Sequence, residues 1–171
     1  MLEKGRTLNK NSGEEVFEGP SESMSKSKKN VIDPETVIKL YGADSVRWFR
    51  LSDSPPERDI QWSDEGISGS YKFMQKIWNI SETINNLDPK TKMDDETKNV
   101  LDKSINKLIK DVTLAIESFH FNVAVAKFYE FINILSKVLH DKNEDKIYLQ
   151  KLFAKFLILI LPIDFKKLFN M

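Results

Sequence analysis

The fold of this chain is decided by the amphipathic stretch NVAVAKFYEFINILSKVL at residues 122–139. Its large apolar side chains recur every three or four residues, which is the spacing of one face of an α-helix. The inward positions are Val125, Phe128, Tyr129, Ile132, Leu135 and Leu139. Asn122 precedes this stripe, where an amide side chain can cap the first turn. The stretch therefore predicts a long helix that buries one face and has its N-cap at Asn122.

Three further segments repeat this spacing. The first follows Ser63, a good N-cap residue, and ends at Asp88-Pro89. The first segment has the stripe Phe73, Ile77, Ile80, Ile84 and Leu87. The second has Leu101, Ile105, Leu108, Val112, Ile116 and Phe119. The third covers about Glu144–Leu161 and has Leu149, Leu152, Phe153, Phe156 and Ile160. Four such helices with short polar connections predict an antiparallel bundle. We expect residues 63–171 to fold without the remainder of the chain, because these stripes hold most of the large apolar side chains.

Residues 1–62 have a different texture. Two short extended pieces, Arg6–Leu8 and Glu15–Phe17, flank a polar loop and predict a β-hairpin. The run GPSESMSKSKKN at residues 19–30 has no apolar periodicity or apolar anchor and predicts a mobile loop.

Two short helices are predicted after this loop. One starts at Asp33-Pro34 and stops at Gly42, and the next is capped by Asp44. Asp59–Trp62 alternates between polar and apolar residues and predicts a short strand. The expected fold class is mainly α: an antiparallel helical bundle preceded by a small α/β connecting module with a mobile loop.

Composition excludes several classes of function. The chain has 26 basic and 26 acidic residues, which argues against a protein that holds nucleic acid by bulk charge alone. Without cysteine, disulfides and thiolate chemistry are excluded, and with only two histidines we expect no protein-bound metal. There is no signal-peptide pattern, and the apolar run Phe156–Ile163 is far shorter than the roughly 20 residues of a spanning helix. These features favour a soluble cytoplasmic protein with no membrane partner.

The segment SMSKSKK at residues 23–29 combines three lysines with three serines. Ammonium groups, hydroxyls and loop N–H groups are what a polyphosphate requires. A solvated polar linker or a basic localisation patch has the same composition, so the segment alone leaves these interpretations open.

The surrounding residues resemble the signature loop of class I aminoacyl-tRNA synthetases, which reads Lys-Met-Ser-Lys-Ser and closes over ATP. The positions of Met24, Ser25, Lys26 and Ser27 match this loop, whereas Ser23 replaces its first lysine. Three further features resemble the leucine-specific members and their helical anticodon-binding domain. These are Lys28-Lys29-Asn30, the segment SPPERDIQWSDEG at residues 54–66 with Gly69, Tyr71, Phe73 and Trp78 after it, and Phe121-Asn122 with Ala124, Ala126 and Leu161-Pro162.

The resemblance implies that leucine and ATP form leucyl-adenylate and pyrophosphate, and that leucine is then transferred to tRNA(Leu). Lys26 is the expected catalytic residue, because its ammonium would stabilise charge on the departing pyrophosphate. Met24, Ser25, Lys26 and Ser27 would form the loop that binds ATP with its Mg²⁺. The candidate tRNA contacts are Lys28, Lys29, Arg47, Arg50 and Arg58. Lys28 and Lys29 equally suit a role in keeping the loop solvated.

Other residues have competing interpretations. Arg50 and Arg58 also suit surface ion pairs with Asp53, Glu57 or Asp59. Lys103, Lys107 and Lys110 suit either tRNA phosphates or a solvated helix face. The tryptophans, Trp48, Trp62 and Trp78, fit the core better than a base-stacking role, and His120 fits packing or capping better than catalysis.

The family's histidine-containing ATP motif, amino-acid pocket and editing domain have no counterpart in these 171 residues. The chain therefore looks like a C-terminal portion: 1–62 would be the end of the catalytic domain with its connecting module, and 63–171 the anticodon-binding-type bundle. Leucine would be bound by the missing catalytic half, so the chain alone is expected to be inactive. The alternative function is a non-catalytic, stand-alone tRNA-binding or adaptor module, which Ser23 in place of lysine favours.

Overall fold

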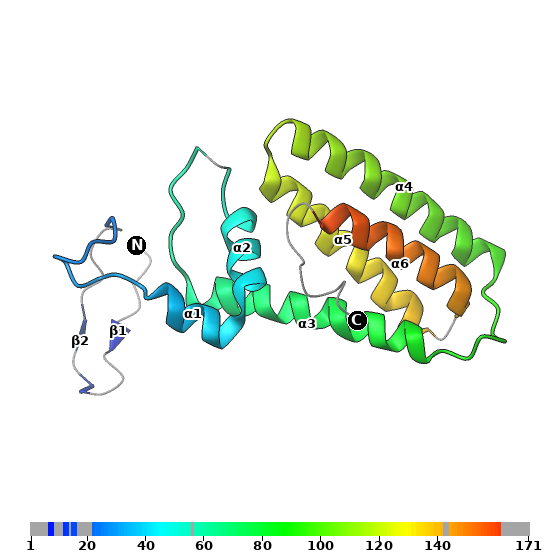
Figure 1. Ribbon diagram of the computed structural model, residues 1–171, viewed down its shortest axis with the longest axis horizontal. Coiled ribbons are helices and arrows are strands. Elements are labelled where there is room, and N and C mark those ends of the chain that lie inside the picture. The colour runs from blue at the N-terminus through cyan, green and yellow to red at the C-terminus, as the bar shows by residue number, and fades with distance from the viewer. Residues whose placement is uncertain are drawn as a thin grey trace, which may run out of the picture. The chain divides into compact units, whose positions relative to one another are not determined.

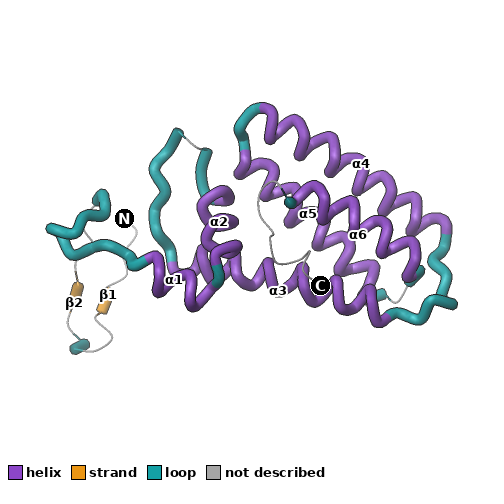
Figure 2. The backbone as a smooth tube through the Cα atoms, viewed as in Figure 1, coloured by secondary structure: helices purple, strands orange, loops and turns teal. Residues whose placement is uncertain are grey.

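The computed structural model describes residues 7–8, 12–13, 15–16, 22–55, 57–141 and 144–161. Within these ranges the chain forms two short strands and six helices, which Figure 1 labels and Figure 2 colours by type. The helices are α1 (Pro34–Tyr41), α2 (Ala43–Ser52), α3 (Asp64–Asn86), α4 (Asp95–Glu117), α5 (Phe121–His140) and α6 (Lys146–Ile160). The predicted mainly α fold is confirmed. The chain divides into two compact units, Met1–Asp33 and Pro34–Met171.

The first unit contains the predicted hairpin. Strands β1 (Thr7–Leu8) and β2 (Glu15–Val16) pair antiparallel, with Thr7 opposite Val16. Gly13, in the connection, has a φ of 71°, a conformation that glycine adopts without a steric penalty. The outer ends of the predicted strands, Arg6 and Phe17, lie outside the described residues.

The second unit begins with α1 and α2, which meet at Gly42. Pro34 is the first residue of α1, as predicted, and the Gly42 N–H donates to the Ile38 carbonyl at 2.9 Å. Gly42 has φ 79° and ψ 154°, a combination that is essentially restricted to glycine. Gly42 is also the N-cap of α2, so the predicted cap at Asp44 is wrong: Asp44 lies in the first turn, where its charge still favours the helix dipole.

The predicted strand at Asp59–Trp62 is also wrong. No described strand lies beside this segment to supply a hydrogen-bonding partner, and the structure has an irregular connection there. Its alternation has another cause: the Trp62 ring packs edge-on against Phe49 at 5.5 Å, and its Nε1 donates to Asp64 at 2.8 Å. The apolar side chain anchors the connection to α2.

Three of the four bundle helices start at a side-chain cap. The Gly66 N–H donates to Ser63 Oγ at 3.1 Å, the Thr97 N–H to Asp94 at 2.7 Å, and the Tyr148 N–H to Asp145 at 3.2 Å. The predicted cap of α3 at Ser63 is thereby confirmed, and its carbonyl accepts from Ile67.

The start of α5 differs from the prediction. Its N-cap is His120, and Asn122 lies inside the first turn of the helix. The shift arises in the tight corner after α4, where Phe119 adopts a φ of 58° and the His120 N–H donates to the Ala115 carbonyl at 2.8 Å. This corner also turns the Phe119 side chain to solvent (65% exposed), so its predicted inward position is wrong.

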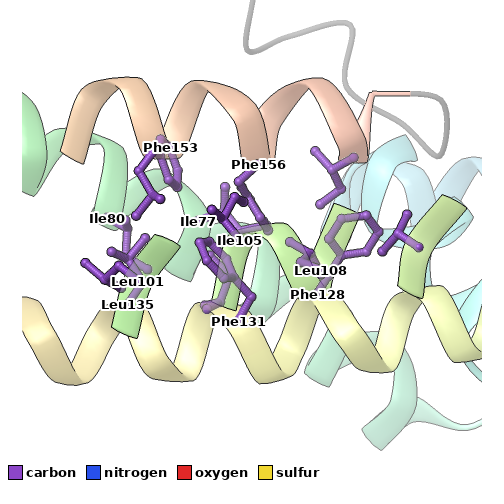
Figure 3. Packing of buried hydrophobic residues seen from close by; sticks show 14 of the residues in the cluster. Ile77, Ile80, Leu101, Ile105, Leu108, Phe128, Phe131, Leu135, Phe153 and Phe156 are labelled. Carbon is purple, nitrogen blue, oxygen red and sulfur yellow. The ribbon is translucent and has the colours of Figure 1, made fainter. Parts of the chain in front are cut away.

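The core of the bundle lies where the predicted stripes meet, as the buried side chains in Figure 3 show. All five predicted positions on α6 are buried, and Ile105 and Ile132 are completely inaccessible. Phe131, which the sequence analysis did not place inside, is also buried and stacks on Phe156 with ring centroids 5.5 Å apart. Trp78, which was expected in the core, is exposed.

Helix α2 contributes to the same core. Trp48 is fully buried, stacks on Phe73 at 5.0 Å, and belongs to the bundle's hydrophobic cluster. The compact units therefore divide at Asp33–Pro34. The boundary expected at Trp62 remains a prediction about the functional domains.

Candidate functional site

The lysine-rich segment forms a closed turn around the side chain of Asn30. The Ser25 N–H donates to Asn30 Oδ1 at 2.8 Å, and Asn30 Nδ2 donates to the Ser23 carbonyl at 3.3 Å. Inside this clamp, the Lys28 and Lys29 N–H groups donate to the carbonyls of Ser25 and Lys26, each at 3.2 Å. One amide side chain thus ties both ends of the turn together and fixes its backbone.

The tip of the turn presents a set of donors to solvent. The backbone N–H groups of Lys26 and Ser27 donate to no described group, and the exposed Lys26 ammonium has no ion partner among the described residues. The hydroxyls of Ser25 and Ser27 are 3.2 Å apart. An ammonium, two N–H groups and two hydroxyls within three residues fit the oxygens of a polyphosphate.

The residues at the edges of the turn differ from its tip. Met24 is 47% exposed. Lys28 forms an ion pair with Glu22 at 2.7 Å, which compensates its charge, whereas Lys29 has no ion partner in the described ranges. Lys29 has a φ of 55°, and this left-handed conformation closes the turn. The turn therefore brings Ser25, Lys26 and Ser27 together at its tip.

The candidate arginines belong to the other unit. Arg47 pairs with Asp44 at 3.4 Å across one turn of α2. Arg50, one turn further along α2, and Arg58, after the helix, are exposed and pair with no carboxylate of the described chain. The ion pairs expected for Arg50 and Arg58 with neighbouring acidic residues are therefore not formed, and both guanidinium groups are open to an external anion.

On α4, Lys107 pairs with Asp111 at 3.3 Å, and Lys103 and Lys110 are exposed. His120 is exposed and its side chain makes no capping hydrogen bond, so it serves α5 only through its backbone. No helix in the described part of the chain is long and apolar enough to cross a membrane. No group of three histidine or acidic side chains in those same ranges could hold a metal ion.

A groove between α3 and α5, of about 420 Å³, is a feature that the sequence analysis missed. Its lining residues are Lys72, Gln75, Lys76, Asn79, Ile80, Thr83, Ser136 and Leu139. The α3 residues recur every three or four positions, so the polar stripe was visible in the sequence. A second hollow, of about 450 Å³, includes Asp53, Asp64 and Glu65 in its lining and is unsuited to an anion.

Two family models match the chain in order. The model described as tRNA synthetases class I (I, L, M and V) matches residues 16–63, and the anticodon-binding domain of tRNA ligase matches residues 98–163. The first match includes the turn and both arginines of α2, and the second covers most of α4 to α6.

The relatives agree with these models. The leucine–tRNA ligase of Bartonella quintana is 42% identical over 157 residues, which cover 87% of this chain and 18% of the relative. That of Ruegeria pomeroyi is 46% identical over 125 residues, covering 73% and 14%. A solved structure of an Agrobacterium radiobacter LeuRS-tRNA-LeuAMS ternary complex matches 82% of this chain and 18% of that chain, with a TM-score of 0.68 and 24% identity. This last match supports the fold alone.

The two ordered family matches and the helical bundle identify the chain as part of a class I tRNA synthetase. Within that class, the chain belongs to the leucine–tRNA ligase family, since its curated relatives at 42% and 46% identity are leucine–tRNA ligases. It spans less than one fifth of the length of these relatives.

Proposed function

We propose that this chain is the segment of a leucine–tRNA ligase that supplies the ATP-binding loop and a tRNA-binding helical domain for leucylation of tRNA(Leu). The observation that carries the proposal is the closed turn at residues 23–30, whose tip gathers the donors of Ser25, Lys26 and Ser27. The rest of the ligase would bind leucine, and the proposed place of action is the cytoplasm.

In this proposal the Lys26 ammonium is the catalytic group. Negative charge accumulates on pyrophosphate as it departs from ATP, so an ammonium held there stabilises the transition state more than the ground state. The N–H groups of Lys26 and Ser27, which donate to no described group, and the two serine hydroxyls orient the phosphate oxygens. Met24 lies at the edge of the site. Mg²⁺ that arrives with ATP neutralises further phosphate charge.

The tRNA contacts are proposed according to which charges are uncompensated. Arg50 and Arg58 are the stronger candidates, because Arg47 is already paired with Asp44. By the same argument Lys29 is a stronger candidate than Lys28, which is paired with Glu22. Each phosphate contact should weaken with rising salt concentration, because binding releases counterions from the RNA.

Leucine-dependent exchange of labelled pyrophosphate into ATP tests the catalytic role. We expect no exchange with the 171-residue chain alone. We expect exchange when the chain replaces the matching segment of the Bartonella quintana ligase, to which it is 42% identical. In this chimaeric enzyme, Lys26→Ala should slow adenylate formation by about 10²–10³-fold, comparable to the loss of an oxyanion-hole donor.

Lys29→Ala is the matched control, since it removes the same charge three residues beyond the tip. Its effect on adenylate formation should be much milder, and leucine binding should not change in either variant. Equal, small effects of the two substitutions would contradict the role of Lys26. Exchange activity of the isolated chain would contradict the assignment of the leucine site to the rest of the ligase.

The second candidate function is a non-catalytic tRNA-binding or adaptor module of the same family. Ser23 favours it, because the resemblance places the first lysine of the signature at this position. A chimaeric enzyme that binds tRNA but remains inactive even after Ser23→Lys would support this second function.

A further inference from the structure

We propose that the groove between α3 and α5 binds the phosphate backbone of tRNA, with Lys72 and Lys76 as the phosphate ligands. The inference rests on the proposed function and gives it a specific surface. None of the tRNA contacts considered above is among the residues that line this groove.

The lining of the groove has the chemistry of an anion site. Of its eight residues two are lysines, four carry neutral polar groups and none is acidic. This segregation is notable in a chain whose 26 basic residues are balanced by 26 acidic ones. Binding to RNA phosphates requires such a local surplus of positive charge, because the net charge of the chain provides none.

The charges in the groove are uncompensated. Lys76 Nζ donates to the neutral amide of Asn133 at 2.8 Å, and Lys72 is exposed without an ion partner in the described ranges. Carboxylates neutralise some lysines elsewhere, as Asp111 does for Lys107 and Glu130 for Lys127 at 2.8 Å, whereas Lys29 resembles Lys72 in having no ion partner in the described ranges. The bond from Lys76 to Asn133 holds its ammonium toward α5 while leaving the charge available to a phosphate.

The neutral polar groups point to a phosphate rather than to an apolar peptide. The Thr83 and Ser136 hydroxyls already donate to backbone carbonyls, at 2.8 Å and 2.7 Å, so the amides of Gln75 and Asn79 are the additional side-chain donors. Of the two apolar side chains in the lining, Ile80 is only 6% exposed and Leu139 is partly buried. Phosphate oxygens would find ammonium and amide donors beside them.

One further lysine lies beside the groove on α5. Lys137 is exposed one helical turn after Asn133, the residue that accepts from Lys76.

The test is the affinity of the full chain for a fluorescently labelled tRNA(Leu) transcript, measured by anisotropy over a range of salt concentrations. Each lost phosphate contact should reduce affinity by about five- to eight-fold at 0.1 M salt and reduce the salt slope by about 0.7–0.9. The Lys72→Gln/Lys76→Gln double variant should therefore bind about 25- to 60-fold more weakly. The control is Lys151→Gln/Lys155→Gln, which removes two exposed charges at the same spacing on α6 and should bind as the unmodified chain does.

Two results would overturn the inference and leave the proposed function standing. One is an equal loss of affinity in the two double variants. The other is an unchanged affinity of Lys72→Gln/Lys76→Gln while the unmodified chain binds. If the unmodified chain does not bind the transcript even at low salt, the groove is not an RNA site. The catalytic role is judged separately by pyrophosphate exchange in the chimaeric enzyme. Thermal melts of all variants should be similar, since Lys72, Lys151 and Lys155 are exposed and Lys76 bonds only to the exposed amide of Asn133.

Discussion

The indole Nε1 of Trp48 donates a hydrogen bond to the hydroxyl of Tyr129 at 3.3 Å, joining α2 to α5 across 81 residues of sequence. The Trp48 ring also lies 5.0 Å from the Phe73 ring and 5.8 Å from the Phe128 ring. Burial raises the pKa of the Tyr129 hydroxyl, which keeps it protonated over the ordinary pH range. Helix α2 is therefore part of the bundle core, although the family match places it with the synthetase segment.

Replacement of Trp48 should be among the most destabilising single substitutions in this chain. Trp48→Ala should lower the free energy of unfolding by about 3–5 kcal/mol, because a fully buried indole is removed and a cavity is left. Tyr129→Phe should cost about 1 kcal/mol, because only the hydrogen bond is lost. Urea denaturation followed by circular dichroism measures both values. A loss below 1 kcal/mol for Trp48→Ala would show that α2 is not docked in solution.

Truncation tests the same packing at the level of whole elements. A chain of residues 34–171 should unfold cooperatively, because it keeps the complete second unit. A chain of residues 63–171 should remain helical but melt at a lower temperature and less cooperatively, since Trp48 no longer covers Phe73 and Tyr129. The apolar stripes of the four helices, in contrast, predict that residues 63–171 fold by themselves. Coincident, equally cooperative melts of the two truncated chains would favour that prediction over the structural argument.

The apolar periodicity predicts the helices well because burial on one face of a helix depends only on the spacing of residues along it. The corner at Phe119 could not be predicted in this way. Its positive φ moves the start of α5 and turns an aromatic side chain to solvent, and both effects depend on the backbone between two packed helices. The groove illustrates the same limit, since Lys72 and Lys76 become part of a site only when α5 places Asn133 and Ser136 opposite them.

Asp145 should make the stability of the chain sensitive to acid. Its carboxylate accepts from the Tyr148 N–H at 3.2 Å and pairs with Lys98 at 3.1 Å. The hydrogen bond from Tyr148, with the help of Lys98, lowers the pKa of Asp145 below its ordinary value. A lowered pKa in the folded state means that the carboxylate stabilises the fold above about pH 4, and that this stabilisation is lost as the pH falls through the lowered pKa.

Asp145→Asn tests this linkage, because an asparagine can still cap α6 but carries no charge. At pH 7 the variant should be less stable by about 1 kcal/mol, the difference between a hydrogen bond to a charged group and one to a neutral group. The difference between the two proteins should shrink progressively below pH 4 in urea titrations. A difference that is independent of pH from 7 down to 2 would mean that the charge of Asp145 does not contribute.

Gly42 should be intolerant of substitution for reasons of backbone conformation alone. A Cβ added there would meet no atom within 4 Å, yet the residue has φ 79° and ψ 154°. Gly42→Ala should therefore destabilise the chain by about 1–3 kcal/mol. The control is Gly69→Ala, in the second turn of α3, which also has open space around the added Cβ. It should stabilise the chain by about 0.5–1 kcal/mol, because alanine favours the helix, and losses of the same size in both variants would exclude the conformational explanation.

Asn30 is expected to act as a positioning residue for Lys26. Its side chain accepts from the Ser25 N–H and donates to the Ser23 carbonyl, so it holds the turn closed without occupying the tip. In the chimaeric enzyme, Asn30→Ala should slow leucine-dependent pyrophosphate exchange by about 10- to 100-fold, since small displacements of a reacting geometry have costs of this order. Asn30→Asp keeps an oxygen for the Ser25 N–H but loses the donor to Ser23, so its rate should lie between those of the unmodified enzyme and Asn30→Ala.

The melting temperature should remain unchanged in both variants, because Asn30 is exposed and outside the bundle core. If the aspartate variant is as slow as the alanine variant, the bond to Ser25 does not position the loop; if both variants retain full activity, the loop reaches its active geometry without the Asn30 clamp.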